Sequence, residues 1–501
     1  MSQNSTTLES TSASLRKEAD QACPTTSQES PVLCVDLDGT LIATDLFWES
    51  LVLMLKQAPL TVVCLPFWAC RGPAYLKQAV ARRVTIDVRH LPYRMEVLSW
   101  LTHEHAKRRR LLLVTGSDLR LAQAVAAHLG LFTDVMGSQG DTNLIGPAKR
   151  DALITRFGSH GFDYVGNSSA DLPVWSSANA AILVAPSSML IRQAQRTARV
   201  ARVFHSGNPS GLLAWAKAFR LHQWIKNTLV FLPIIAAHPP LEISLVAKAL
   251  YAFFAFSLCA SGLYLVNDLL DLPADRRHPR KQHRPLASGA LRIPHALIAI
   301  PILVSAGFGL ALTNLPAYFT CLLALYALAT LGYSLSLKKL AIIDVLTLAG
   351  FYTLRVLAGG VALGIHISAW LLAFSLFFFL SLALGKRHSE LRFRKVTKFE
   401  GIERRAYLGI DKEALGIMGI ISGYLSVLVL ALYLTSEEVL MRHERPQLLW
   451  LLCPLLLYWI SRTWLLAHRG TLEDDPLIVA LRDPHSYAVA ATMGLLGILA
   501  L

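Results

Sequence analysis

The 501-residue sequence predicts two domains of different class: an α/β domain with a helical cap, followed by an all-α membrane domain of about nine transmembrane helices. Hydrophobic residues make up 53% of the chain, charged residues 16%, and the mean hydropathy is +0.44, which is more apolar than one soluble core requires. The long apolar runs begin only after about residue 210. Before that point, short apolar runs alternate with helical patterns and end in polar residues, which is typical of a doubly wound parallel sheet.

Domain boundaries follow from shifts in composition. Residues 1–30 are rich in Ser, Thr and Gln without an apolar segment, so we expect a disordered tail and no secretory signal. The α/β domain should occupy residues 31–203, a turn-rich linker 204–213, and the membrane domain 214–501. Basic loops beside membrane helices explain the net charge of +14. The sequence has no basic stretch with interleaved aromatic residues, so we expect no nucleic-acid binding. Seven cysteines show no metal-ligand spacing.

Polar residues follow several predicted strands of the first domain. The apolar run at Pro31–Val35 ends in an Asp-Leu-Asp-Gly-Thr turn, a second strand ends in Thr-Gly-Ser, and a third is followed by Asn-Ser-Ser-Ala-Asp. A lysine opens one of the intervening helices. Because the carboxyl ends of parallel strands meet at one edge of a sheet, we expect these side chains to share a site. They are Asp36, Asp38, Thr115, Lys149, Asn167 and Asp171.

In order and type, these motifs resemble those of the haloacid dehalogenase-like (HAD) hydrolases over roughly residues 31–200. The resemblance implies that Asp36 is a nucleophile that forms an aspartyl-phosphate and Asp38 the general acid/base. It also implies that Thr115 binds a phosphoryl oxygen and that Lys149 offsets negative charge. The implied ligands of Mg²⁺ are Asp36, Asp38, Asn167 and Asp171. The family usually has an acidic residue where this chain has Asn167, so the alternatives are an active phosphatase and a weakened or structural domain.

An insertion of about residues 45–109 separates the first two motifs. Its apolar segment Leu51–Cys70 is interrupted by Lys56, Pro59 and Pro66, which makes it a poor membrane-spanning helix. In the resembling family, such insertions form a cap that selects the substrate. Two alternatives remain open: the cap lies on the membrane face and admits a lipid-linked phosphate, or it buries its own apolar face.

The second half of the chain contains the candidate spans. An amphipathic segment leads into the first, Thr228–Ala237, and the others follow at residues 244–268, 294–313, 316–334, 341–363, 367–385, 413–435, 447–467 and 485–501. Basic residues cluster after the second, fourth and sixth spans, whereas the intervening loops carry almost no charge. The positive-inside rule therefore predicts a multi-pass protein of the inner (plasma) membrane with these loops and the α/β domain in the cytoplasm.

The stretch Asn267–Pro279 follows an apolar run and contains Asp268, Asp271 and Asp275. Spacings of three and four residues place their side chains on one helical face. Carboxylates that repel one another in a poorly solvated place need cations, and Mg²⁺ is the cation we expect. The alternative is an exposed loop in which these are ordinary turn residues.

This aspartate pattern, together with about nine spans, resembles the UbiA superfamily of intramembrane transferases, which bind a diphosphate substrate through Mg²⁺. Most prenyltransferases of that superfamily have a second aspartate-rich motif, where this chain has Tyr333-Ser-Leu-Ser-Leu-Lys338-Lys-Leu-Ala-Ile-Ile-Asp344. That pattern is closer to the polyprenyl-phosphate phosphoribosyltransferases. So are Gln223-Trp-x-Lys226-Asn227, Gly385-Lys386-Arg387-x-x-Glu390, Arg462-x-Trp464, and Asp475-Pro followed by Asp483.

The resemblance implies transfer of phosphoribose from phosphoribosyl pyrophosphate (PRPP) to a polyprenyl phosphate, with release of pyrophosphate. Lys338, Lys386 and Arg387 would supply cations for phosphates, and Arg355, in mid-span, is expected to face a polar cavity with Asp344 as partner. The expected substrate-binding residues are Lys226, Asn227, Asn267, Tyr333, Lys338, Asp344, Arg355, Lys386, Arg387 and Glu390. The HAD-like domain would then remove the ribose phosphate, for the synthesis of cell-envelope or related glycans.

Two other functions compete with this one. An aromatic prenyltransferase would move a polyprenyl group from its diphosphate, and the missing second aspartate-rich motif counts against it. In the other alternative the N-terminal domain is regulatory or a scaffold. The expected partners are the two substrates and the lipid bilayer. The sequence leaves open whether the protein forms a homo-oligomer.

Overall fold

The computed structural model describes residues 31–140, 142–205, 211–237, 242–397, 407–442, 444–470 and 483–500. The expected tail, much of the linker and Asp475 lie outside these ranges. The chain forms two compact units. The α/β unit consists of Met1–Leu41 and Arg94–Ser206, and the membrane unit of Ile42–Tyr93 and Gly207–Leu501.

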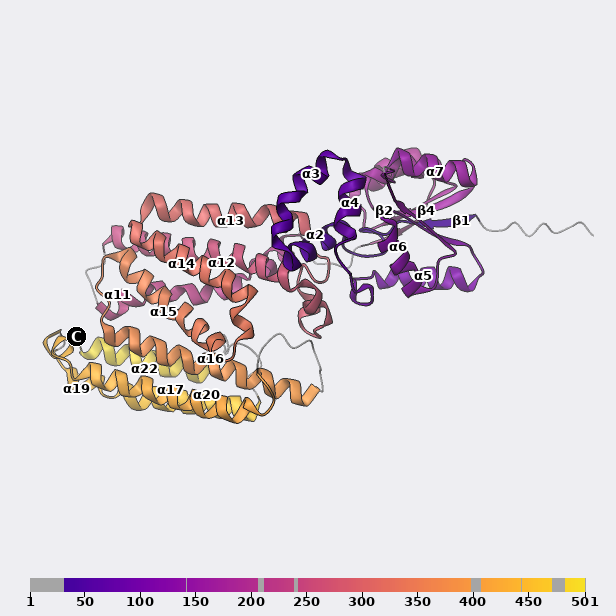
Figure 1. Ribbon diagram of the computed structural model, residues 1–501. Coiled ribbons are helices and arrows are strands. Elements are labelled where there is room, and N and C mark those ends of the chain that lie inside the picture. Colours follow the sequence, from indigo (N-terminus) through magenta and orange to yellow (C-terminus); the bar gives the residue numbers. More distant parts are fainter. Residues whose placement is uncertain are drawn as a thin grey trace, which may run out of the picture. The chain divides into compact units, whose positions relative to one another are not determined.

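The α/β unit is built on a six-stranded parallel sheet, which confirms the predicted sheet type (Figure 1). Its strand order is β3-β2-β1-β4-β5-β6. The strands are β1 (Val32–Val35), β2 (Leu111–Asp118), β3 (Asp134–Ser138), β4 (Phe162–Gly166), β5 (Ala180–Val184) and β6 (Val200–Phe204). The helices are α5 (Met95–Ala106), α6 (Leu119–Leu129), α7 (Pro147–Phe157), η3 (Ser169–Asp171), α8 (Leu172–Trp175) and α9 (Ser188–Thr197).

The order of the strands reverses between β1 and β4. After β1 the chain builds outward through β2 and β3, and it then returns to add β4, β5 and β6 on the other side. Open α/β sheets bind ligands where the order reverses in this way. Gly39 follows β1 with φ +74°, and a Cβ there would lie 2.2 Å from Nδ2 of Asn167, which follows β4. The two turns that carry the predicted motifs are therefore in close contact.

The insertion between β1 and β2 divides between the two units. Its first part contains α2 (Leu46–Gln57), η1 (Pro59–Cys64), α3 (Leu65–Cys70), α4 (Pro73–Ala81) and η2 (Val88–His90), and belongs to the membrane unit. The following α5, which lies within the predicted range of about 45–109, belongs to the α/β unit. We call residues 42–93 the docked insertion. An antiparallel bridge between Ile42 and Tyr93 closes it at its base.

The docked insertion packs against α12 (Ile243–Arg277), a helix of 35 residues. Trp48 and Val52 of α2 contact an apolar cluster that includes Leu269 and Leu272 of α12. The guanidinium of Arg276 donates to both carboxylate oxygens of Glu49, at 2.5 and 3.0 Å, and both side chains are buried. Two further contacts are the Arg277–Asp87 ion pair at 2.5 Å and the hydrogen bond from Lys56 Nζ to the Leu270 carbonyl at 2.5 Å.

The remainder of the membrane unit is helical, as predicted (Figure 1). Before α12 come α10 (Gly211–Ala218), η4 (Leu221–Phe231) and α11 (Leu232–Ala237). After it come η5 (Lys281–His283), α13 (Ile293–Asn314), α14 (Ala317–Leu335), η6 (Leu337–Lys339), α15 (Ile343–Leu363) and α16 (Ala369–Thr397). The last helices are α17 (Asp411–Leu434), α18 (Glu437–Arg442), α19 (Pro446–Leu449), α20 (Leu452–Arg469) and α22 (Pro484–Ala500).

Within the described residues, seven helical segments are long and apolar enough to span a membrane, rather than the nine expected: α12 to α17, and Pro446–Arg469. The first predicted span begins as the 3₁₀-helix η4, which buries the polar Lys226 and Asn227. The last, α22, has 17 residues, fewer than the roughly 20 that a spanning helix needs. The second reaches Arg277 instead of ending at residue 268, so all three aspartates lie on continuous helix.

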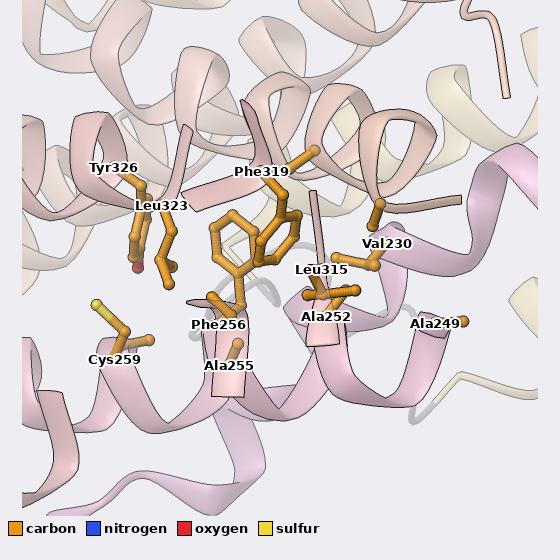
Figure 2. Packing of buried hydrophobic residues seen from close by; sticks show 14 of the residues in the cluster. Val230, Ala249, Ala252, Ala255, Phe256, Cys259, Leu315, Phe319, Leu323 and Tyr326 are labelled. Atoms are coloured by element: carbon orange, nitrogen blue, oxygen red, sulfur yellow. The ribbon is translucent and has the colours of Figure 1, made fainter. Parts of the chain in front are cut away.

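Small residues let the membrane helices approach one another. On α12, Ala249, Ala252 and Ala255 face the same buried cluster, and Figure 2 shows Phe256 directed at Phe319 of α14. The Phe256 and Phe319 rings are 5.6 Å apart between centroids in an edge-to-face arrangement. This packing holds the first half of α12, whereas its last turns, which carry the aspartates, pack through Leu265, Leu269 and Leu272 in a separate apolar cluster.

Candidate functional site

The predicted motif residues of the α/β unit converge at the carboxyl edge of its sheet. Lys149 of α7 donates to Asp36 Oδ1 at 2.8 Å, and Thr40 donates to Asp36 Oδ2 at 3.0 Å. Thr115, in β2, donates to Asp38 Oδ2 at 2.9 Å. Asp36 is buried, while Asp38 is partly exposed. A buried carboxylate beside an ammonium group and a second, more exposed carboxylate is an arrangement that suits nucleophilic attack assisted by an acid/base.

Asp171 organises the loop after β4. Its Oδ2 accepts hydrogen bonds from the backbone of Asn167 and Ser168, each at 3.0 Å, and from the Ser168 hydroxyl at 3.2 Å. Its Oδ1 accepts from the Tyr164 hydroxyl at 3.0 Å. The contacts of Asp171 are therefore those of a loop-holding residue, and its expected role as a direct metal ligand stays a prediction.

Burial and charge set the protonation of this site. Burial raises the pKa of Asp36 from 3.8 to about 7, partly offset by the Lys149 ammonium group and reinforced by Asp171 and Asp38. Burial works against the charge of Lys149, but the carboxylates of Asp36 and Asp171 outweigh it and raise the pKa of the lysine. Lys149 therefore stays cationic at neutral pH.

In the membrane unit, basic side chains surround the three aspartates of α12. Arg220 donates to Asp268, and Arg284 donates from Nη1 to Asp268 Oδ1 at 3.0 Å and Asp275 Oδ2 at 2.6 Å. Lys338 of η6 donates to both oxygens of Asp271 at 2.9 Å, and to Asn267 Oδ1 at 3.4 Å. We call this set the aspartate cluster: Arg220, Asn267, Asp268, Asp271, Asp275, Arg284 and Lys338.

A second set, the Asp344 cluster, joins α14, α15 and α16. Asp344 and Arg387 form a buried ion pair, with nitrogen–oxygen distances of 2.5 and 2.9 Å, and Tyr333 donates to Asp344 at 2.7 Å. Arg387 also donates to Glu390 at 2.8 Å. Because η6 connects α14 to α15, Lys338 lies a few residues from both Tyr333 and Asp344 along the chain. The predicted Lys386 lies beside Arg387 on α16 and is half-buried.

Arg355 has different partners from those expected. It donates to Asn227 Oδ1 at 2.8 Å, to the Tyr326 hydroxyl at 3.0 Å and to the Phe351 carbonyl at 2.6 Å, whereas Asp344 pairs with Arg387. Asn227 in turn donates to Ser257 at 2.9 Å. These bonds satisfy a mid-span guanidinium and link η4, α14 and α15, so Asn227 and Arg355 have an evident structural role. Their contact with substrate, like that of Lys226, stays a prediction.

The aspartate cluster has the donor chemistry that Mg²⁺ requires. Oxygens of Asp268 and Asp275 converge on a single cationic nitrogen, Nη1 of Arg284, and carboxylate oxygens are preferred ligands of Mg²⁺. A cation that replaced this contact would displace the Arg284 side chain. In the part of the chain that the structure describes, no three or more His, Cys, Asp or Glu side chains already form a metal-binding group.

Sequence reasoning missed three residues of these sites. Tyr164 lies within the buried strand β4, where its sequence context is that of a core aromatic residue. Arg220 precedes η4 in a left-handed backbone conformation, φ +51°, which no local motif indicates. Arg284 belongs to the basic loop after α12. The basic residues of that loop predicted its side of the membrane, and nothing in the local sequence distinguished Arg284 as a binding residue.

The membrane unit matches a known family. Residues 228–477 match the model of the UbiA prenyltransferase family, and this range includes the Asp344 cluster, Arg355 and every residue of the aspartate cluster except Arg220. The C-terminal part of the chain belongs to the UbiA prenyltransferase family. It is an integral membrane protein, and its UbiA part is a transferase by family.

Individual relatives extend this assignment. An uncharacterized protein y4nM of Sinorhizobium fredii is 34% identical over 463 residues, covering 92% of this chain and 89% of that protein. The nodulation protein NoeC of Azorhizobium caulinodans is 32% identical over 274 residues, covering 55% and 89%. A decaprenyl-phosphate phosphoribosyltransferase of Corynebacterium glutamicum is 36% identical over 178 residues, which are 35% of this chain and 54% of that enzyme. The match to y4nM is long enough to include most of both units.

Proposed function

We propose that the membrane unit transfers phosphoribose from PRPP to a polyprenyl phosphate. The observation that carries the proposal is the basic lining of the aspartate cluster, in which Arg220, Arg284 and Lys338 contact the three carboxylates. PRPP and a polyprenyl phosphate together carry a diphosphate and two separate phosphates, and they need more cations than a prenyl diphosphate does. The similarity to a decaprenyl-phosphate phosphoribosyltransferase supports the same choice.

In the transfer, an oxygen of the acceptor phosphate forms a bond to the anomeric carbon of the ribose while the bond from that carbon to the diphosphate breaks. The electron pair leaves with pyrophosphate, and no base has to remove a proton. Asp268 and Asp275 would hold Mg²⁺, which when bound neutralises the leaving group. Lys338, which donates to both oxygens of Asp271, would contact phosphate oxygens. Tyr333 and Asp344 fix the guanidinium of Arg387, which would serve as a further cation for phosphate.

The α/β unit would then hydrolyse the ribose phosphate. Asp36 attacks phosphorus, and the phosphorus–oxygen bond to ribose breaks as Asp38 donates a proton to the leaving oxygen. Water attacks the aspartyl-phosphate, and Asp38 takes the proton back. Lys149 and Thr115 stabilise the negative charge that builds up on the phosphoryl group. Support for this step comes from the convergence of Asp36, Asp38, Thr115 and Lys149 at one sheet edge.

A double label separates the two steps. Membranes that contain the protein are supplied with Mg²⁺, polyprenyl phosphate and PRPP labelled with ¹⁴C in ribose and ³²P at the 5-phosphate. Transfer places both labels in the lipid, and phosphatase action then releases ³²P as inorganic phosphate while ¹⁴C stays in the lipid. Asp271→Asn should abolish both signals, and Asp36→Asn should abolish only phosphate release. If the lipid made by the unsubstituted protein keeps its ³²P together with its ¹⁴C, the phosphatase step is refuted and the transfer is not.

The rival function is transfer of a polyprenyl group from its diphosphate to an aromatic acceptor, with a regulatory α/β unit. The name of the matching family favours it. No ¹⁴C in the lipid, together with transfer from labelled polyprenyl diphosphate to an aromatic acid, would establish this rival and refute the phosphoribosyl transfer.

A further inference from the structure

The docked insertion carries an exposed apolar segment whose purpose neither proposed reaction explains. The segment is Pro59–Cys70, which forms η1 and α3. None of its twelve residues is charged, and the structure describes all of them. Leu60 is 85% exposed, Val63 77% and Phe67 59%, while Trp68 is the one buried side chain. Single exposed apolar residues are common on protein surfaces, but an uncharged run of this length marks an interaction surface.

The attachment of the segment to a membrane-spanning helix indicates that lipid contacts its exposed side chains. Lys56, three residues before Pro59, donates to the carbonyl of Leu270 on the membrane-spanning α12. Trp48 and Val52 on the preceding helix pack against Leu269 and Leu272 of the same helix. The exposed apolar segment is therefore fastened to the end of a helix whose apolar length lies in lipid. Because the segment is attached to this helix, the lipid bilayer is the apolar environment closest to it.

The ends of the segment have the character of a membrane interface. Lys56 precedes it and Arg71 follows it, so basic groups flank an uncharged apolar centre. The Arg71 guanidinium lies 4.8 Å from the Phe67 ring centroid and donates to the Tyr75 hydroxyl at 3.1 Å. Basic residues beside aromatic and aliphatic ones suit the boundary between lipid head groups and acyl chains. Trp68 packs with Met54 and Val80 and ties the segment to the rest of the insertion.

We propose that Pro59–Cys70 is seated in the bilayer, in the leaflet that borders the aspartate end of α12. The segment lies in the plane of the membrane surface and does not cross it, because twelve residues are too short to span. Leu60, Val63 and Phe67 contact the acyl chains. The docked insertion thereby holds the polypeptide between β1 and β2 on the lipid surface, where a polyprenyl phosphate presents its head group. The seating itself does not rest on either proposed reaction.

Cys64 lies within the segment and is exposed, so it can carry a reporter. In a full-length background with Cys23, Cys70, Cys321 and Cys453 changed to Ala, the buried Cys34 and Cys259 remain. A nitrobenzoxadiazole fluorophore on Cys64 is studied in phospholipid nanodiscs. The matched control carries the fluorophore on Thr85→Cys, an exposed polar position of the same insertion, with Cys64→Ala. Nitroxides on the lipid acyl chains should quench the fluorescence of the Cys64 label and not that of the control label. Aqueous iodide should quench the control label and not the Cys64 label.

Adding Val63→Glu with Phe67→Glu should restore iodide quenching at Cys64, and adding Thr85→Glu should not. Quenching of the Cys64 label by iodide as strong as that of the control label in the unchanged segment would overturn the proposal. So would shielding from iodide without quenching by the acyl-chain nitroxides, because protein, such as a second copy of the chain, would then cover the segment. The labelled protein with its native segment tests the proposal even if the Glu variants do not fold.

Discussion

The carboxylate of Asp36 has to be charged to attack phosphorus, and its burial works against that charge. The shift of its pKa from 3.8 to about 7 means that the unprotonated form disappears as the pH falls below neutrality. A cation held by Asp36 favours the charged carboxylate, so with Mg²⁺ present we expect the hydrolysis of p-nitrophenyl phosphate by the purified protein to fall, at most about tenfold per pH unit, only below a pH that is itself lower than 7. Asp36→Asn should be inactive throughout. A rate that does not fall anywhere between about pH 4 and pH 8 would show that Asp36 is not the titrating nucleophile.

Arg387 and Asp344 are a fully buried ion pair, with side chains 2% and 0% exposed. Removing one partner leaves the other charge uncompensated and should destabilise the protein by about 3–5 kcal/mol. We therefore expect Asp344→Leu and Arg387→Met each to lower the melting temperature in detergent strongly. The double variant Asp344→Leu with Arg387→Met should melt higher than either. Lys339→Met, at an exposed neighbouring position, should melt like the unchanged protein. Additive losses in the double variant would exclude a coupled pair.

At the scale of the elements, the contact of α2 with α12 joins segments that lie far apart in the sequence. Glu49→Gln keeps the volume of the side chain but removes the charge that pairs with the buried Arg276. We expect the docked insertion to loosen, which is measured as faster tryptic cleavage at Lys56, Arg71, Arg82 and Arg83. Glu96→Gln, an exposed position in α5, serves as the control and should leave the cleavage rate unchanged. Unchanged cleavage in Glu49→Gln would mean that apolar packing alone holds the insertion.

Local patterns of sequence predicted the parallel sheet, the motif turns and most of the spans, because each depends on residues close together in the chain. The strand–turn motif at Asp36 and the three-and-four spacing of Asp268, Asp271 and Asp275 are of this kind. The partners of those residues could not be predicted from local sequence. Arg220 and Arg284 reach Asp268 from different segments, and the pairing of Glu49 with Arg276 spans 227 positions. Such contacts depend on how the elements pack, which no single segment specifies.

For the whole molecule, the arrangement of charged loops predicts the orientation in the membrane. The loop after α12 contains Arg280, Lys281, Arg284 and Arg292, and η6 contains Lys338 and Lys339, whereas residues 315–316 and 364–368 contain no Lys or Arg. Truncated chains fused after residue 285 or 339 should give a fluorescent cytoplasmic reporter, and those fused after residue 315 or 366 an active periplasmic phosphatase. The opposite pattern would place both proposed active sites outside the cytoplasm.

The docked insertion is synthesised long before the helix that holds it. Glu49 leaves the ribosome 227 residues before Arg276, a delay of roughly 11–45 s at typical rates of synthesis. By then the strands β2 to β6 have been synthesised, so the sheet can close while the insertion within it still lacks its seat. The insertion reaches its final position only when the carboxyl end of α12 has emerged. A gene cut at the linker would leave Glu49 and Arg276 on separate chains, so the docked insertion and α12 would have to find each other after synthesis.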